Sequence, residues 1–317
     1  MNNKKKIISD TDHDIDDTMA IYFALMSSKL DVLGLTTVYG NTSNIQGTEN
    51  ALRILEKAKR NDLTVHTGSS KPLATEYLGK GEVVHGLDGQ GNSNLIKPRL
   101  KSSKINAVDF LKNKINEHPE EITIVPIGPL TNIAHLFIQN KGIDKKISEI
   151  VLMGGNALSQ GNASPAAEAN IKNDPEAADI VFSSNAKITM VGLDVTNKVF
   201  MDEATIHQIT NHGSEITEHI KVILPHYVNF LTEFYDKKGM PIHDSSAIAY
   251  LINEELFKTI SYPIVVETEG ISRGKTWMGT SKTEDTNNPW INRLPINICI
   301  DVDSEKTLKL IVNTLTC

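Results

Sequence analysis

Strand-like and helix-like segments alternate along most of this chain. Short apolar segments have the composition of buried strands, at residues 6–9, 32–38, 63–66, 122–126, 150–153 and 188–193. Helix-like segments separate or follow them, at 17–28, 45–58, 107–117, 130–139 and 175–183. Consecutive parallel strands need a crossover between them, which is usually a helix. The alternation therefore predicts an α/β fold with a mostly parallel central sheet, flanked by helices, and a Rossmann-like core.

The last third of the chain is more helical. It has helix-like segments at 202–209, 214–235, 245–252 and 304–314, and one strand-like segment at 263–267. With 317 residues, 39% of them hydrophobic, the chain can bury a large core. No repeat and no long linker rich in Gly, Ser or Pro divides it, so we expect a single domain spanning residues 1–317.

Charge and cysteine content narrow the class of protein. The net charge of −7 gives no support for a nucleic-acid or anionic-membrane partner. Only two apolar residues follow Lys4, Lys5 and Lys6, too few for a signal peptide, and no segment has the length of a membrane span. Cys299 and Cys317 lack the spacing of a zinc site. We expect free thiols and a cytoplasmic protein.

Polar residues gather where the predicted strands end. The segment 10–17 follows the first strand and contains five carboxylates within eight residues. Polar or glycine-bearing stretches also follow later strands, at 38–41, 126–132, 153–156 and 192–197. Turn formation alone accounts for any one of them. In an open parallel sheet, however, ligands bind at the carboxyl ends of the strands, so together they predict one composite site.

The aspartate cluster favours a bound cation. Neighbouring carboxylates raise the free energy of ionising one another, and all-oxygen ligands suit Ca²⁺ or Mg²⁺. An EF-hand does not fit, because Ile15 and Ile21 replace its glycine and glutamate. A haloacid-dehalogenase-like phosphatase also has Asp-x-Asp after its first strand and stays an alternative, although its later Lys and acidic pair are not clear here. A solvated helix start explains Asp16 and Asp17 but not the earlier aspartates.

The order Asp10-Thr11-Asp12-His13-Asp14-Ile15-Asp16-Asp17 resembles the signature of the nucleoside hydrolases of inosine–uridine type. Other stretches resemble this family in the expected order: VYGN (38–41), VHGLDG (84–89), VPIGPLTNIA (125–134), VLMGG (151–155), GNASPAAEANIKNDPEAA (161–178) and IHD (242–244). These matches extend along nearly the whole chain. The resemblance implies Ca²⁺-dependent hydrolysis of the N-glycosidic bond of ribonucleosides, giving ribose and a free base.

The resemblance also implies a role for each matching residue. Ca²⁺ is expected to bind the carboxylates of Asp12, Asp17 and Asp244 and the main-chain carbonyl of Ile127. Asp12 is also the expected general base, and His243 the expected general acid for the departing base. The expected ribose contacts are Asp16, Asn41, Asn162, Glu168 and Asn170. Asp10 is expected to orient the metal-binding loop.

Three further residues are expected near the nucleobase. His85 matches a second histidine found there in some members of the family. Tyr227 and Tyr235 share one face of the predicted helix 214–235 and match the residues that cover the base. A tyrosine instead of an arginine at the latter position resembles the pyrimidine-preferring branch. We therefore expect uridine to be cleaved better than inosine, by a homodimer or homotetramer.

One departure from the family lies inside the metal-binding loop. His13 and Asp14 stand where most members have Pro-Gly. We expect the extra carboxylate of Asp14 to be solvated. A catalytically weak relative that binds a ribosyl ligand is a second hypothesis, against which the complete set Asp12, Asp17, Asp244, Asn170 and His243 argues.

Overall fold

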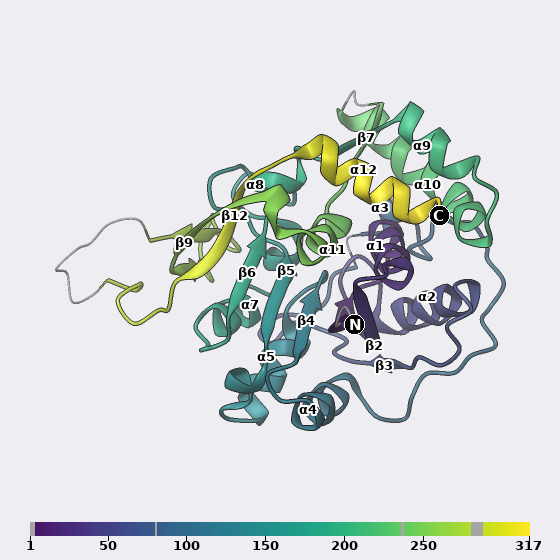
Figure 1. Ribbon diagram of the computed structural model, residues 1–317. Helices are drawn as coiled ribbons and strands as arrows, with labels where there is room; N and C mark the ends of the chain where they lie inside the picture. The colour runs from purple at the N-terminus through teal and green to yellow at the C-terminus, as the bar shows by residue number, and fades with distance from the viewer. Residues whose placement is uncertain (1–3, 80, 236–237, 280–287) are drawn as a thin grey trace.

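The computed structural model describes residues 4–79, 81–235, 238–279 and 288–317, and a sheet of eight strands runs through this part of the chain (Figure 1). In spatial order the strands are β3 (Val65–Thr67), β2 (Leu30–Thr37), β1 (Lys5–Thr11), β4 (Ile122–Pro126), β5 (Glu149–Met153), β6 (Ile188–Val191), β12 (Ile296–Val302) and β9 (Phe257–Tyr262). Neighbours run parallel except β12 and β9, which are antiparallel.

Helices cover both faces of this sheet (Figure 1). One face carries α1 (Ile15–Met26), α2 (Asn44–Lys57), α10 (Glu215–Tyr235), α11 (Asp244–Ile252) and α12 (Ser304–Leu315). The other carries α4 (Ala107–Glu117), α5 (Thr131–Gln139) and α7 (Pro175–Phe182). The short elements are α3 (Glu82–His85), α6 (Ala169–Asn173), α8 (Leu193–Thr196), α9 (Glu203–Thr210), the 3₁₀ turns at Ile143–Lys146 and Glu254–Leu256, and the pairs β7 (Phe200–Asp202) with β8 (Gly239–Pro241) and β10 (Ile264–Val266) with β11 (Thr276–Met278).

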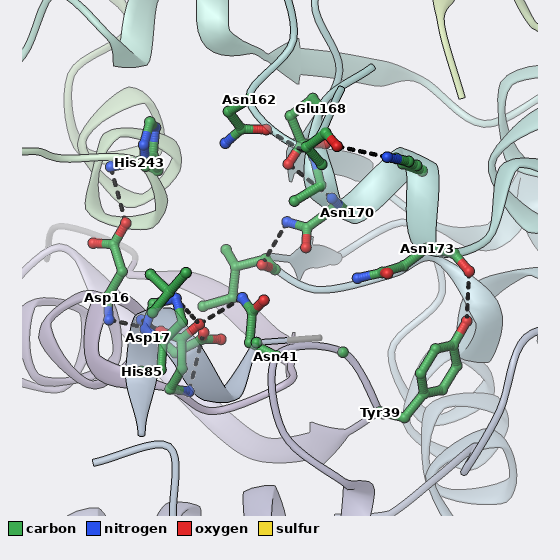
Figure 2. A pocket seen from close by; sticks show the side chains of 18 of the residues that line it. Asp16, Asp17, Tyr39, Asn41, His85, Asn162, Glu168, Asn170, Asn173 and His243 are labelled. Atoms are coloured by element: carbon green, nitrogen blue, oxygen red, sulfur yellow. Dashed lines mark hydrogen bonds and ion pairs between the residues drawn. The ribbon is translucent and has the colours of Figure 1, made fainter. Parts of the chain in front are cut away.

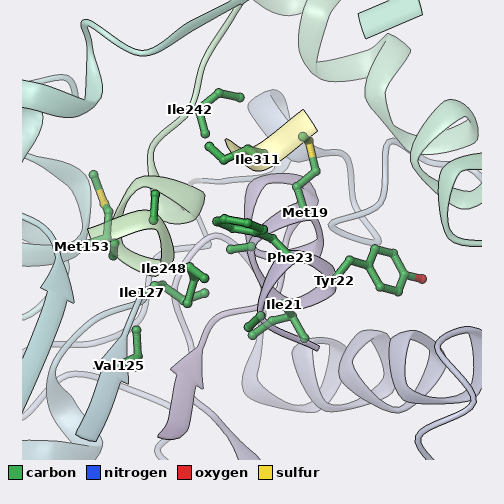
Figure 3. Packing of buried hydrophobic residues seen from close by; sticks show 14 of the residues in the cluster. Met19, Ile21, Tyr22, Phe23, Val125, Ile127, Met153, Ile242, Ile248 and Ile311 are labelled. Carbon is green, nitrogen blue, oxygen red and sulfur yellow. The ribbon is translucent and has the colours of Figure 1, made fainter. Parts of the chain in front are cut away.

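The core has two layers because side chains along a strand alternate between faces. Ile7 belongs to the hydrophobic cluster on the α1 side and the next residue, Ile8, to the cluster on the α5 side. Helix α1 is buried along most of its length, and Figure 3 shows Phe23 packed among side chains that include Ile248 of α11 and Ile311 of α12. The start of α1, which follows the aspartate loop, is therefore held from several sides.

The predicted fold class is confirmed: the chain forms a single-domain α/β fold with a mostly parallel sheet. β4 and α4 have the predicted bounds, and most other elements differ by one or two residues. The strand predicted at 188–193 ends at Val191, because Leu193 already begins α8. Strands β9 and β12 at the sheet edge were not predicted. None of the described helices has the length and apolar composition needed to cross a membrane.

β1 is the point at which the strand order changes direction, since it pairs with β2 on one side and β4 on the other. The loops that leave such neighbouring strands turn to opposite faces and open a crevice at their carboxyl ends. The aspartate loop leaves β1 here, and Ile127 directly follows β4. The topology therefore places both segments at one crevice.

Candidate active site

A cavity of about 680 Å³ lies at the carboxyl ends of these strands (Figure 2). Among the residues that line it are Asp14, Asp16, Asp17, Asn41, His85, Ile127, Asn162, Glu168, Asn170, Tyr227, His243 and Asp244. They come from strand exits and helix starts far apart in the sequence. The cavity thus brings together residues from the predicted strand exits at 10–17, 38–41, 126–132 and 153–156, whereas none of its described lining residues comes from the exit at 192–197.

Helix capping shapes the aspartate loop. Asp14 is the N-cap of α1, and its Oδ1 accepts from the backbone nitrogens of Asp16 at 2.7 Å and Asp17 at 3.3 Å. Asp17 returns a contact, since its Oδ2 accepts from the backbone nitrogen of Asp14 at 3.3 Å. This reciprocal capping box fixes where the helix begins. His13 just before it has a φ of 47°, so the chain turns sharply between strand and helix.

The carboxylates of this loop lie close together. Asp12, Asp14 and Asp17 are buried, and each has an oxygen within 4.8 Å of the others. Burial raises the pKa of Asp12 and Asp17 well above the usual range, and the charge of Asp14 adds to this. Asp244 at the start of α11 has a raised pKa for the same reason, with Asp16 as its strongest charged neighbour. Such a buried, all-oxygen cluster is suited to a hard metal ion.

The backbone packs closely around Asp12. Its Oδ2 accepts from the backbone nitrogen of Asn41 at 2.6 Å, and its main-chain oxygen accepts from the hydroxyl of Thr42 at 2.6 Å. A Cβ atom at Gly40 or Gly128 would collide with the Asp12 carboxylate, so both positions need glycine. Oδ1 of Asp12 is buried and has no hydrogen-bond partner within the described residues. Asp12 itself is below the lining of the cavity.

Asp10 lies one layer deeper. Its Oδ1 accepts from the hydroxyl of Thr36 at 2.5 Å and from Nδ2 of Asn132 at 2.8 Å. Burial raises the pKa of Asp10 to about 7, although the two hydrogen bonds act in the opposite direction. Asp10 therefore joins β1 to β2 and α5 beneath the aspartate loop, and its expected orienting role stays a prediction.

Asp16 connects the beginning of the chain to α11. Its Oδ2 accepts from the backbone nitrogens of His243 at 3.1 Å and Asp244 at 3.4 Å (Figure 2). The pKa of Asp16 is raised to about 7, mainly by burial and also by the charge of Asp14. The His243 ring is held separately, with Nδ1 2.8 Å from the hydroxyl of Thr196. The late His-Asp pair is thereby fixed beside the aspartate loop.

Amides and a carboxylate form the opposite wall (Figure 2). Nδ2 of Asn170 donates to the main-chain oxygen of Ile127 at 2.8 Å, which brings the expected backbone ligand to the cavity. Glu168 caps α6, with Oε1 accepting from the backbone nitrogen of Asn170 at 2.8 Å. Asn162 lies at the exposed rim and accepts from the backbone nitrogen of Ala169 at 3.0 Å. This wall offers several polar groups to a polyhydroxylated ligand.

The remaining wall is aromatic. The rings of His85 and Tyr227 are stacked, with centroids 5.1 Å apart and planes at 21°. Phe230 and Leu231 of α10 and Val84 of α3 continue this wall. One flank of the cavity is thus polar and acidic, and the other is flat and apolar, as a ribose joined to a heterocyclic base requires.

Comparison with known proteins agrees with this geometry. The model of the family described as inosine-uridine preferring nucleoside hydrolase matches residues 7–309. The chain belongs to this family. It is 37% identical to uridine nucleosidase 1 of Arabidopsis thaliana, over 97% of this chain and 92% of the relative. It is 39% identical to a pyrimidine-specific ribonucleoside hydrolase of Salmonella arizonae, over 83% of this chain and 85% of the relative.

The fold comparison gives the same result. A solved structure described as a plant nucleoside hydrolase, PpNRh1, superimposes with a TM-score of 0.96 at 36% identity, covering 99% of this chain and all of that one. The predicted family and the predicted enzyme class, a ribonucleoside hydrolase, are therefore confirmed.

The structure gathers most of the expected site residues of this nucleoside hydrolase at one cavity, with Asp12 and Asp10 beneath its lining. Tyr235 ends α10, but its side chain lies outside the described part of the structure, so its expected contact with the base stays a prediction. The expectation that Asp14 is solvated is wrong: the residue is only 2% exposed. It is buried because it caps α1 and contacts Asn41 and His85.

Sequence reasoning missed several residues that line the cavity, among them Tyr77, Lys172 and Arg273. Tyr77 lies edge-on to Tyr39, with ring centroids 5.3 Å apart. Arg273 forms a bidentate ion pair with Glu176 at 2.7 and 2.8 Å. Tyr77 and Arg273 lie outside every stretch that resembles the family, and Lys172 lies within the stretch 161–178, where no role was expected for it.

Proposed function

We propose that this nucleoside hydrolase cleaves the N-glycosidic bond of ribonucleosides with the help of Ca²⁺ and that it prefers pyrimidine nucleosides. The observation that carries the ion is the buried carboxylate cluster at the strand exits. Asp12, Asp17, Asp244 and the carbonyl of Ile127 would hold it. Their donor atoms are all oxygens, and Oδ1 of Asp12 has no partner among the described residues, so the donor set fits Ca²⁺.

The reaction transfers a water oxygen to C1′ of the ribose while the bond to the base breaks. Bound Ca²⁺ would lower the pKa of a coordinated water and anchor the ribose diol. Asp12 would accept the proton of the attacking water. His243 would donate a proton to the departing base, with its Nδ1 held by Thr196. One proton is taken up and one is given, so the enzyme ends with its charge unchanged.

Positive charge develops on the ribose as the base departs, as in other glycoside cleavage. Asp16, with one oxygen fixed by the backbone of His243, would meet the 2′-hydroxyl together with Asn41. Asn170, Glu168 and Asn162 would meet the other hydroxyls from the opposite wall. Negative charge prearranged around the developing cation stabilises the transition state more than the ground state.

The preference for pyrimidines rests on two observations. The names of the two curated relatives refer to uridine and to pyrimidines. The base side of the cavity carries the stacked rings of His85 and Tyr227, which suit a flat heterocycle. A haloacid-dehalogenase-like phosphatase has no such support here. A catalytically weak ribosyl-binding relative is disfavoured by the proximity of the complete set of expected catalytic groups.

The proposal extends to the assembly and location of the enzyme, a homodimer or homotetramer in the cytoplasm that acts on free nucleosides. Its support is the family resemblance and the free state of Cys299 and Cys317. Light scattering coupled to gel filtration measures the assembly directly.

Release of reducing ribose from uridine and inosine, with and without a chelator, tests the proposal. We expect a higher kcat/KM for uridine, and loss of both activities with the chelator. Asp12→Asn should lower kcat by at least about a hundredfold, because general base catalysis contributes that much. Asp303→Asn, at an exposed helix cap far along the chain, serves as the control and should leave activity intact. Full activity of Asp12→Asn would assign the base elsewhere.

A further inference from the structure

The strand exit at residues 192–197 contains no described lining residue of the cavity, but one of its side chains contacts a segment that does. Asp194, in the first turn of α8, contacts the segment between β5 and α6, residues 156–167, which we call the rim loop. The rim loop carries Asn162 and leads directly into Glu168, and both of these residues line the cavity (Figure 2). The exit is therefore placed to support one wall of the cavity from outside its lining.

The carboxylate of Asp194 accepts hydrogen bonds from three consecutive backbone nitrogens of the rim loop. Oδ2 accepts from Ala157 at 2.7 Å, and Oδ1 accepts from Leu158 at 2.8 Å and from Ser159 at 2.7 Å. Hydrogen bonds to a carboxylate are stronger than those between neutral groups. Asp194 is only 7% exposed, so water competes little for them. The start of the rim loop is therefore fixed to the turn that follows β6.

Lys275, directly before β11, holds the same stretch by its carbonyl groups. Its Nζ donates to the main-chain oxygen of Asn156 at 2.6 Å and to that of Ser159 at 3.4 Å. Lys275 and Asp194 are both buried, and burying a charge is costly unless polar groups compensate it. Here the C=O groups of the loop compensate the ammonium and its N–H groups compensate the carboxylate. Asp194 and Lys275 together form what we call the charge clamp.

The clamped stretch is joined to the residues that face the cavity. Nδ2 of Asn156 donates to the main-chain oxygen of Ala166 at 3.0 Å, which closes the rim loop two residues before Glu168. The backbone nitrogen of Gly155 donates to Oε2 of Glu168 at 2.9 Å. Asn162 lies within the loop that these contacts close. A shift of the clamped stretch would therefore displace both Asn162 and Glu168.

We propose that Asp194 and Lys275 are positioning residues that hold the rim loop where Asn162 and Glu168 meet the 5′-hydroxyl of the ribose. This inference rests on the proposed hydrolysis of ribonucleosides, in which the ion anchors the ribose diol and leaves the 5′-hydroxyl to this wall. The rim loop has no regular secondary structure, so its order depends on such contacts. Small displacements of substrate-binding groups cost much of the rate, even when the cause lies far from the reacting atoms.

Hydrolysis of uridine and of 5′-deoxyuridine by Asp194→Asn tests this role. Asparagine has nearly the same size, but its Nδ2 cannot accept the hydrogen bond that a carboxylate oxygen accepts. We expect kcat/KM for uridine to fall about tenfold, because a contact to the 5′-hydroxyl is weakened, and kcat/KM for 5′-deoxyuridine to fall less than about twofold. Equal effects on the two substrates, whether large or absent, would overturn the proposal.

Lys275→Met tests the clamp from its other side and leaves the fold better supported. The hydroxyl of Thr276 still donates to the main-chain oxygen of Asn156 at 2.9 Å, and Nδ2 of Asn156 to that of Ser159 at 2.9 Å, so both carbonyls keep a donor. The ratio of kcat/KM for uridine to that for 5′-deoxyuridine should fall about threefold or more. An unchanged ratio in Lys275→Met would overturn the charge clamp.

Asp144→Asn is the matched control. Asp144 also joins two loops through its carboxylate, because its Oδ2 accepts from the backbone nitrogen and from Nδ2 of Asn185, each at 2.9 Å. Asn185 comes before β6, however, and so lies at the end of the strand away from the cavity. This variant should leave the substrate ratio unchanged. A ratio that falls here as well would report general loosening of the fold and would overturn the proposal.

Amide hydrogen exchange reports the clamp without any turnover. The backbone amides of Ala157, Leu158 and Ser159 should exchange at least about tenfold faster in Asp194→Asn than in the wild type. Unchanged exchange would overturn the proposal. Failure of the proposed function would be recognised differently, by a wild-type protein that releases ribose from no ribonucleoside although these three amides are protected.

Discussion

His243 occupies a position at which the backbone and the side chain are held by different parts of the chain. Its backbone nitrogen donates to Asp16, and its Nδ1 lies 2.8 Å from the hydroxyl of Thr196. A histidine held in this way presents its other nitrogen in one direction. An imidazole placed in this way can serve as the proton donor to a leaving base.

His243→Ala should therefore damage the hydrolysis of nucleosides that need a protonated leaving group. We expect kcat for uridine to fall about a hundredfold or more. A 4-nitrophenyl riboside, whose leaving group departs without a proton, should lose less than about tenfold. Steady-state kinetics with both substrates measures the difference. Equal losses on the two substrates would mean that His243 does not act as the acid.

The sequence predicted the residues of the aspartate loop better than it predicted their surroundings. Asp12 and Asp17 follow a motif, and they are buried together as expected. Asp14 lies between them and was misjudged, because burial of a carboxylate depends on partners that local sequence does not reveal. Those partners are Asn41, in the loop after β2, and His85, the last residue of α3.

At the scale of elements, α1 and α10 are joined by one buried polar pair. The hydroxyl of Tyr22 lies 2.6 Å from Nδ1 of His219, and both residues are nearly inaccessible to solvent. The pKa of His219 is lowered from 6.5 to about 3, mainly by burial and to a smaller extent by the charges of Lys57 and Arg53. The ring is therefore neutral in the folded protein throughout the physiological pH range.

This pair should make stability depend on pH. The pKa of His219 is lower in the folded protein than in the unfolded chain, so the unfolded chain binds the proton more tightly. The contribution of His219 is present above pH 6.5 and is lost as the pH falls from 6.5 toward 3, by up to about 1.4 kcal/mol per pH unit. Urea unfolding at pH 7, 6 and 5 measures the free energy of unfolding.

His219→Gln keeps a partner for Tyr22 but does not titrate. Its free energy of unfolding should fall less steeply between pH 7 and 5 than that of the wild type. Identical slopes for the two proteins would show that His219 is not buried in a neutral state.

The elements themselves were predicted unequally, for physical reasons. β4 is buried along its whole length and α4 has a polar cap, Asn106, so both are recognisable from local sequence. β9 is an edge strand whose residues are mostly exposed, with the sequence FKTISY. It lacks the continuous apolar run of a central strand, because only one of its sides has a neighbour to pair with.

At the scale of the whole molecule, the proposed ion site joins segments from the start, middle and end of the chain. Asp12 and Asp17 follow β1, Ile127 follows β4 and Asp244 begins α11. These buried carboxylates repel one another when they are ionised. A bound ion would remove this repulsion and would cross-link β1, β4 and α11.

Ca²⁺ should therefore stabilise the whole fold. A ligand that binds only the folded state adds about 2.7 kcal/mol at a hundred times its Kd, which raises Tm by several degrees in a protein of this size. Differential scanning calorimetry of chelator-treated protein, with Ca²⁺ or Mg²⁺ added back, measures this shift and identifies the preferred ion.

Asp244→Asn should abolish the shift, while Asp303→Asn, at the exposed cap of α12, should retain it in full. Asp244 is far from the aspartate loop in the sequence and comes close to it only in the folded chain. A Ca²⁺-induced rise in Tm that persists in Asp244→Asn would therefore place the ion elsewhere. A Tm unaffected by any divalent ion would remove Ca²⁺ from the proposed mechanism.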